Sequence, residues 1–194
     1  MGFRIWDLGF VKPRPVVAPG STIHKAATAG RVGKWESSRV PNVIEGQIES
    51  PAGRFAIVVS RYNESITSKL LEGALETFGS HGVADESIDV VHVPGAWELS
   101  VVAARLARRG AHAAVLCLGA VIRGETTHDR HINRAVSTAL AHVSVETEVP
   151  VLFGLLTCET LEQAIHRSGG KAGNKGAECA LAALEMADLM RKLP

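Results

Sequence analysis

The chain has 194 residues, enough for one domain of ordinary size and too few for two. Hydrophobic residues make up 46% of the sequence and charged residues 21%, a balance typical of a globular protein with a packed core. The net charge of +1 does not favour binding to nucleic acid or to an anionic membrane. No uninterrupted apolar stretch reaches the roughly 18–20 residues of a membrane span.

The charge is unevenly distributed because residues 1–40 are basic. They carry seven Lys and Arg residues against Asp7 and Glu36, a balance of +5, so the rest of the chain is near −4. Three prolines, several glycines and no sustained periodicity predict that this N-terminal extension is disordered or irregular. An Arg-rich, acid-poor targeting segment is the alternative. We expect the folded domain over residues 41–194.

Cysteine usage indicates a reducing compartment. Cys117, Cys158 and Cys179 are scattered and odd in number, which fits neither a disulfide framework nor a zinc knuckle. We therefore expect reduced thiols in a cytoplasmic protein, or in an organelle if residues 1–40 are a transit segment.

Regular hydrophobic periodicity begins at residue 42. Residues 42–49 alternate as a short strand does, and residues 54–60 form the apolar run of a buried strand. Apolar residues at helical spacing then predict a helix over residues 65–82, which Gly82 ends. Strands and helices alternate from there to the C-terminus. The further strands are expected at 88–93, 111–122 and 149–157, and the further helices at 96–109, 127–146, 160–168 and 176–192.

This alternation of strands and helices predicts an α/β fold. Four strands that are each followed by a helix form a central, mostly parallel sheet with helices on both faces. Ligands of such folds bind at the carboxyl ends of the strands. The residues that follow each strand are therefore the candidate site residues.

The first two strand ends carry an aromatic residue and a carboxylate. Tyr62 is the only tyrosine of the chain, and its ring can stack on a flat heterocycle or merely cover a helix end. After the second strand, Pro94 and Gly95 form a tight turn into a helix. Glu98 then falls in the first helical turn, where it either binds a polyhydroxy ligand or complements the helix dipole.

The third strand ends in GETTHDRHIN, residues 124–133. Thr126 and Thr127 are expected at the start of a helix, where unpaired N–H groups and hydroxyls form an anion site. His128 can exchange a proton near neutral pH. His128 and His131 can share one helical face and could pair on a metal, but the pattern supplies no third ligand, so this interpretation is the weaker one.

The fourth strand contains Phe153 and leads to the Gly-rich, basic stretch RSGGKAGNKG, residues 167–176. This stretch lacks the order of a nucleotide P-loop because Lys175 is followed by Gly176. Arg167 suits bidentate phosphate recognition, although an exposed turn with solvated cations explains it equally well. Taken together, the residues at the strand ends indicate a condensation or isomerisation site more than a hydrolase site.

Several stretches resemble the 6,7-dimethyl-8-ribityllumazine synthase family, in order and without large gaps from about residue 42 to 192. They are RYNESITSKLLEGA, VPGAWELSVVAARLA, LGAVIRGETTH, VPVLFGLLTCETLEQAIHRSGGKAGNKG and AECALAALEMADLM. The resemblance implies a flavodoxin-like three-layer sandwich. It also implies a transferase of riboflavin biosynthesis that condenses 5-amino-6-(D-ribitylamino)uracil with 3,4-dihydroxy-2-butanone 4-phosphate, with no cofactor and no metal.

The resemblance implies roles for individual residues. His128 matches the proton-transfer residue. Arg167, Thr126 and the main-chain N–H of Glu125 match the phosphate-binding positions. The residues expected at the ribitylaminouracil are Tyr62, Asn63, Ala96, Trp97, Glu98, Ala120, Val121, Ile122, Phe153 and Lys175.

The resemblance further implies a homo-oligomer whose active sites lie between subunits, because Phe153 and Arg167 are expected to reach a neighbour's site. The family forms pentamers, and in many members twelve pentamers close into an icosahedral 60-mer. The short turn from Arg167 to Lys171 carries no insertion that would block such closure, which favours the 60-mer. The forty-residue N-terminal extension could interfere with closure, so the pentamer is the alternative. Riboflavin synthase is a candidate further partner.

The sequence departs from the family pattern behind the histidine. Asp129 and Arg130 follow His128, whereas the family often has an aromatic residue there. Two alternatives to the enzyme remain open. One is a binding protein for ribityl compounds without turnover, and the other is a metal-dependent phosphohydrolase built on His128, Asp129 and His131.

Overall fold

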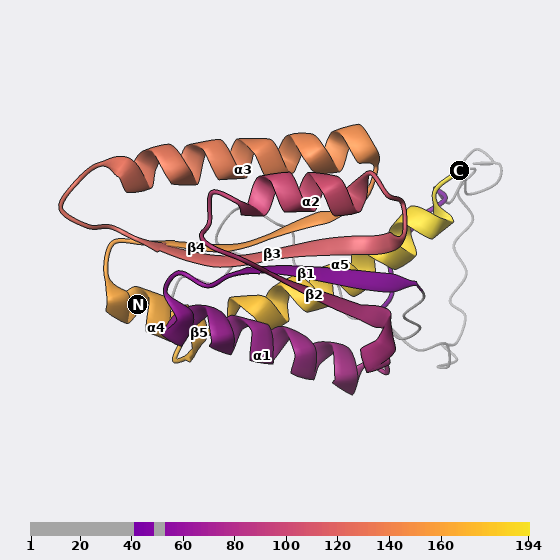
Figure 1. Ribbon diagram of the computed structural model, residues 1–194. Coiled ribbons are helices and arrows are strands. Elements are labelled where there is room, and N and C mark those ends of the chain that lie inside the picture. The colour runs from indigo at the N-terminus through magenta and orange to yellow at the C-terminus, as the bar shows by residue number, and fades with distance from the viewer. Residues whose placement is uncertain (1–40, 49–52) are drawn as a thin grey trace, which may run out of the picture. The chain divides into compact units, whose positions relative to one another are not determined.

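A parallel sheet of four strands runs through the computed structural model, which describes residues 41–48 and 53–194 (Figure 1). The strands lie in the order β2-β1-β3-β4, and all three pairings are parallel. The prediction of an α/β fold is confirmed. The strands are β1 (Arg54–Ser60), β2 (Ile88–Val93), β3 (His112–Ile122) and β4 (Val151–Cys158).

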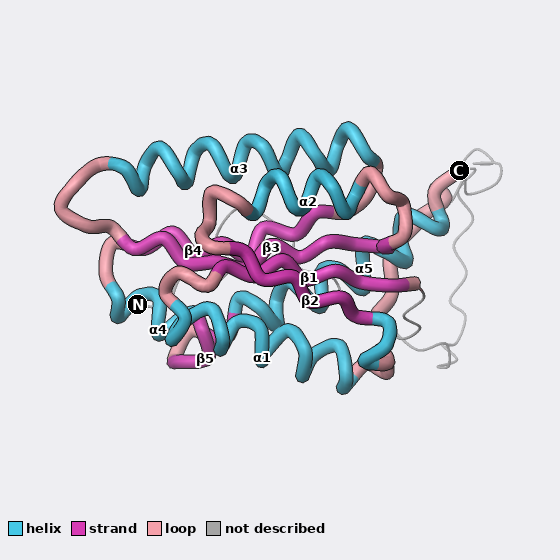
Figure 2. The backbone as a smooth tube through the Cα atoms, in the orientation of Figure 1, coloured by secondary structure: helices cyan, strands magenta, loops and turns pink. Residues whose placement is uncertain are grey.

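Helices cover both faces of this sheet and form a three-layer sandwich (Figures 1 and 2). On one face lie α2 (Leu99–Ala107) and α3 (His128–Thr147). On the other face lie α1 (Glu64–Ser80), α4 (Leu161–Arg167) and α5 (Lys175–Lys192), and a short 3-10 helix, η2 (Asp85–Ser87), precedes β2. The predicted boundaries of these strands and long helices agree with the structure to within three residues. None of the helices in the described part of the chain is long and apolar enough to cross a membrane.

The two faces of the sheet bury two separate hydrophobic cores. In β1, Phe55 and Ile57 pack in the core beneath α1 and α5, whereas Ala56 and Val58 pack in the core beneath α2 and α3. Strands covered on both faces must be apolar at successive positions rather than at alternate ones. This requirement explains the continuous apolar run of β1.

The short N-terminal strand predicted for residues 42–49 is not found, because residues 41–48 form no strand. A strand needs an edge to pair with, and Ile48 instead packs against the core beneath α1 and α5. The main-chain N–H of Gln47 donates to Asp188 Oδ2 of α5 over 2.8 Å, and Lys192 Nζ donates to the carbonyl of Glu45 over 2.9 Å. The predicted disorder of residues 1–40 lies outside the described residues.

A small hairpin in the Gly-rich stretch was not predicted. Strands β5 (Ser168–Gly170) and β6 (Gly173–Asn174) are antiparallel and connect α4 to α5. Gly169 has a φ of 112° and Gly173 a φ of 84°, backbone conformations that favour glycine over other residues. The hairpin brings the end of α4 back to the start of α5.

Asp188 predicts a specific dependence of stability on pH. Its pKa is lowered from 3.8 to about 2, first by the hydrogen bond from Lys192 and then by the N–H of Gln47. Because the folded-state pKa lies below that of the unfolded chain, this stabilisation is complete above about pH 4 and is lost as the pH falls towards about 2. We expect Asp188→Asn to lower the Tm near neutral pH and the difference from the wild type to vanish in acid, as measured by circular dichroism. A Tm difference that stays constant over this range would contradict the expectation.

Candidate active site

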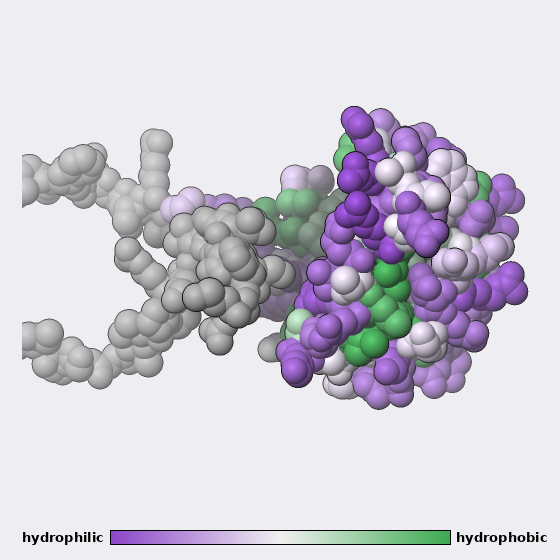
Figure 3. All heavy atoms as spheres, turned by 90° about the vertical axis from the view of Figure 1, so that its left-hand side faces the viewer, coloured by the Kyte–Doolittle hydropathy of each residue, from purple (hydrophilic) through white to green (hydrophobic). Residues whose placement is uncertain are grey.

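A cavity of about 320 Å³ opens at the carboxyl edge of the sheet. Figure 3 looks onto this end of the molecule, where a hydrophobic patch lies between hydrophilic side chains. Eight of the residues predicted at the site line the cavity together with three that were not predicted. The lining residues are Tyr62, Gly95, Ala96, Trp97, Glu98, Ala120, Val121, Ile122, Gly124, His128 and Ile132.

Tyr62 and Asn63 are held where β1 passes into α1. The N–H of Tyr62 donates to the carbonyl of Pro94 over 3.1 Å, and the Tyr62 side chain is 71% exposed. Asn63 has a left-handed backbone with a φ of 61°, and its side-chain amide donates to the carbonyl of Ala120 over 2.8 Å. Asn63 does not line the cavity in this chain; it joins the start of α1 to the end of β3.

The turn after β2 fixes the carboxylate of Glu98. The main-chain N–H of Gly95 donates to Glu98 Oε2 over 2.9 Å, so the side chain folds back over its own turn. The neighbouring Trp97 is 58% exposed. An exposed indole and an exposed phenol at one cavity leave a wide apolar surface for a planar ligand.

The start of α3 places His128 at the cavity. The Thr126 hydroxyl is hydrogen-bonded to His128 Nδ1, which leaves Nε2 as the nitrogen that can exchange a proton with a ligand. Glu125 and Thr126 are exposed and lie between Gly124 and His128, which both line the cavity. Ile132 was missed by the sequence analysis, although its spacing of four from His128 places it on the same face of the helix.

Asp129 and Arg130, the departure behind the histidine, face a different cavity. This second cavity, of about 500 Å³, lies between α3 and β4 and includes Phe153 in its lining. Asp129 is only 8% exposed, and its Oδ1 has no hydrogen-bond partner among the described residues. Within the same residues, no three His, Cys, Asp or Glu side chains are placed to hold a metal ion together.

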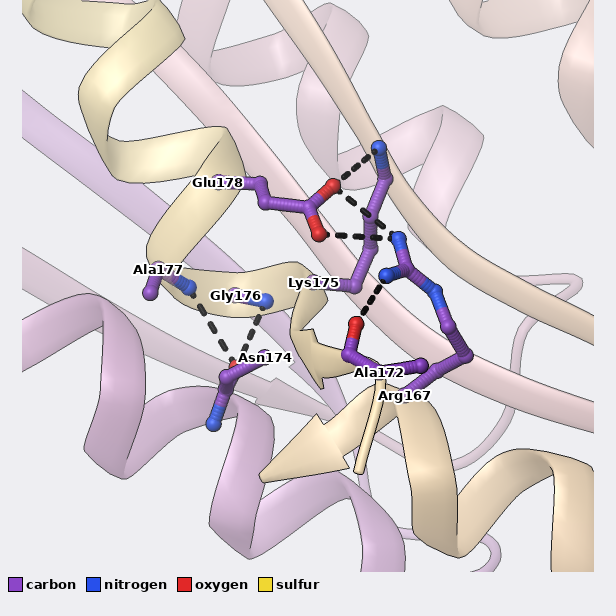
Figure 4. A network of polar contacts seen from close by, with 7 residues as sticks. All are labelled: Arg167, Ala172, Asn174, Lys175, Gly176, Ala177 and Glu178. Atoms are coloured by element: carbon purple, nitrogen blue, oxygen red, sulfur yellow. Dashed lines mark hydrogen bonds and ion pairs between the residues drawn. The ribbon is translucent and has the colours of Figure 1, made fainter. Parts of the chain in front are cut away.

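Three further predicted site residues lie apart from the first cavity, on β4 and at the junction of α4 and α5. Phe153 is on β4, whereas Arg167 and Lys175 belong to a polar network at the junction of α4 and α5 (Figure 4). Burial raises the pKa of the Cys158 thiol at the end of β4, and the nearby Arg167 charge opposes this rise. A single chain therefore carries two separate groups of predicted site residues.

Two comparisons with known proteins identify the family of this chain. The sequence profile described as 6,7-dimethyl-8-ribityllumazine synthase matches residues 52–191. The chain is also 53% identical over 154 residues to a 6,7-dimethyl-8-ribityllumazine synthase of Desulfotalea psychrophila, a match that covers 79% of this chain and 99% of that protein. The chain therefore belongs to the 6,7-dimethyl-8-ribityllumazine synthase family.

Proposed function

We propose that this enzyme condenses 5-amino-6-(D-ribitylamino)uracil with 3,4-dihydroxy-2-butanone 4-phosphate to form 6,7-dimethyl-8-ribityllumazine, the penultimate step of riboflavin biosynthesis. Beside the family membership, one observation carries this proposal: seven expected substrate-binding residues and the expected catalytic residue, His128, line one cavity. An amine of the pyrimidine attacks the ketone and one water leaves. Phosphate is then eliminated, and the second amine closes the ring on the remaining carbonyl with loss of a second water. Such steps depend on aligned reactants and proton transfer rather than on a strong nucleophile.

The cavity offers separate surfaces for the ring and the chain of the pyrimidine substrate. The rings of Tyr62 and Trp97 cover the heterocycle, and main-chain groups of residues 120–122 bind its polar edge. Glu98 accepts hydrogen bonds from ribityl hydroxyls. Asn63 supports this surface by holding the carbonyl of Ala120 in place.

His128 is the proton-transfer residue of this proposal. Its Nδ1 is engaged with the Thr126 hydroxyl, so Nε2 carries the exchange with the substrate amine or the leaving oxygen. A positioned acid–base group contributes about 10²–10⁴-fold to rate in typical enzymes. Thr126 thus orients the histidine, while the main-chain N–H of Glu125 remains the phosphate ligand that the resemblance implies.

A neighbouring subunit completes the site in this proposal. Members of the family form homo-oligomers, and Phe153, Arg167 and Lys175 stand apart from the cavity of their own chain. We propose that they reach the cavity of the next subunit in a pentamer, and that pentamers assemble further into the 60-mer. Mass in solution, measured by light scattering, separates a monomer from either assembly.

The direct test is turnover by the purified full-length protein. With both substrates and an excess of chelator, we expect formation of the fluorescent lumazine at the rate seen without chelator. No product from authentic substrates would overturn the proposal, and binding of the pyrimidine without turnover would favour a carrier protein. Activity that disappears with chelator would favour the metal-dependent phosphohydrolase.

A further inference from the structure

A carboxylate, Glu178, already pairs with Arg167, the cation that the resemblance assigns to the substrate phosphate, and with the neighbouring cation Lys175 (Figure 4). Arg167 Nη2 lies 2.9 Å from Glu178 Oε1 and 3.0 Å from Oε2. Lys175 Nζ lies 3.2 Å from the same Oε2. All three side chains are about one-third exposed, so the network is open to a small anion from solvent.

The guanidinium of Arg167 is held at both of its terminal nitrogens. Nη2 faces Glu178, and Nη1 donates to the carbonyl of Ala172. No hydrogen bond from Nε is present among the residues that the structure describes. A phosphate that binds Arg167 must therefore either displace Glu178 from Nη2 or use the remaining N–H groups of Nη1 and Nε, close to the Glu178 charge.

Asn174 fixes the main chain around the Arg167–Lys175–Glu178 network, and a phosphate can bind without moving this main chain. Asn174 Oδ1 accepts the N–H groups of Gly176 and Ala177 at the start of α5, and Asn174 Nδ2 donates to the carbonyl of Lys69 in α1. The hydrogen bond from Arg167 Nη1 to the Ala172 carbonyl does not involve Glu178. Loss of the Glu178 charge therefore leaves Arg167 in place and frees its Nη2.

We propose that Glu178 is a built-in competitor for phosphate that keeps the affinity of Arg167 and Lys175 for phosphate low. The guanidinium recognises carboxylate and phosphate through the same donors, so the two anions exclude each other there. Phosphate at any other donor of Arg167 is repelled by the Glu178 carboxylate. The inference rests on the proposed function, in which phosphate is a product and must leave before the next turnover.

The test is a titration of inorganic phosphate into the full-length protein at constant ionic strength, followed by calorimetry. We expect Glu178→Gln to bind phosphate about fivefold more tightly than the wild type, the size of effect expected for a partly exposed ion pair. Glu185→Gln is the matched control, because Glu185 is an exposed residue of the same helix, and it is expected to bind phosphate as the wild type does. Glu178→Ala removes the carboxylate without adding an amide and is expected to act in the same direction.

Steady-state kinetics give an independent measurement. Phosphate is expected to inhibit Glu178→Gln at about one-fifth of the concentration needed for the wild type. Unchanged phosphate affinity in both Glu178 variants would overturn the inference. Weaker phosphate binding would also overturn it, since Glu178 would then position Arg167 rather than compete for it. Absence of lumazine formation by the wild type would overturn the proposed function instead, and the phosphate titration can still be interpreted.

Discussion

Arg167→Ala is expected to raise the KM for 3,4-dihydroxy-2-butanone 4-phosphate by about a hundredfold, while the KM for the pyrimidine changes less than about threefold. The physical reason is the planar guanidinium, which can donate two charge-assisted hydrogen bonds to one phosphate. Each such bond contributes about 1.5–3 kcal/mol, so losing two is a large effect even after solvent has replaced part of it. Initial rates with each substrate varied in turn measure the two KM values.

Two further variants separate charge from shape in this result. Arg167→Lys keeps the positive charge and loses the planar fork, so its KM for the butanone phosphate is expected between those of the wild type and the alanine variant. Arg191→Ala breaks the 2.7 Å ion pair with Asp188 at the far end of α5 and is expected to leave both KM values unchanged. An equal loss for both substrates in Arg167→Ala would show that Arg167 does not bind phosphate.

The order of strands and helices could be predicted because each signal was local. The apolar run of β1 predicts a buried strand from seven consecutive residues. The helical spacing of Ile66, Leu70 and Phe78 predicts the buried face of α1 in the same local way. The position of the cavity could be predicted from the order of the strands, because parallel strands bring their carboxyl ends to one edge of the sheet. Tyr62 and His128 meet there although they lie far apart in sequence.

The interactions that were missed are set by distant parts of the chain. The sequence placed Asn63 at a strand end, but only the fold shows that its amide bonds Ala120 of β3. The pairing of Glu178 with Arg167 likewise requires the β5–β6 hairpin, whose form depends on glycines with positive φ. Residues 42–49 were predicted to form a strand from their alternation, but an alternating pattern does not specify a partner edge.

The cavity that the Asp129 side chain faces could not be predicted from the sequence and is set by the fold. Asp129 directly follows His128 in sequence, but the structure turns Asp129 towards the cavity that contains Phe153. Successive residues on a helix point about 100° apart, so neighbours in sequence readily serve different surfaces. No ion pair joins Asp129 to His128 within the described residues, and His128 is instead held by Thr126.

Gly176→Ala is expected to destabilise the fold by about 3 kcal/mol or more, which is the upper end of the usual cost of overpacking. A Cβ at this position would lie 1.9 Å from the carbonyl oxygen of Leu70 and 2.7 Å from its carbonyl carbon. These are main-chain atoms of α1, so no side-chain rotation can relieve the contact. Helices α1 and α5 would have to move apart and open the core beneath them, which contains Phe78 and Leu184.

Gly79→Ala is the matched control in the same pair of helices. A Cβ on Gly79 would meet nothing within 4 Å, and alanine in a helix is favoured over glycine by about 0.5–1 kcal/mol. We therefore expect thermal unfolding to show a Tm at or above that of the wild type for Gly79→Ala, and a Tm lowered by several degrees for Gly176→Ala. Equal Tm values for the two variants would mean that α1 and α5 tolerate a wider separation. The start of α5 also carries Lys175 and Glu178, so the folded fraction of Gly176→Ala should in addition bind phosphate differently from the wild type.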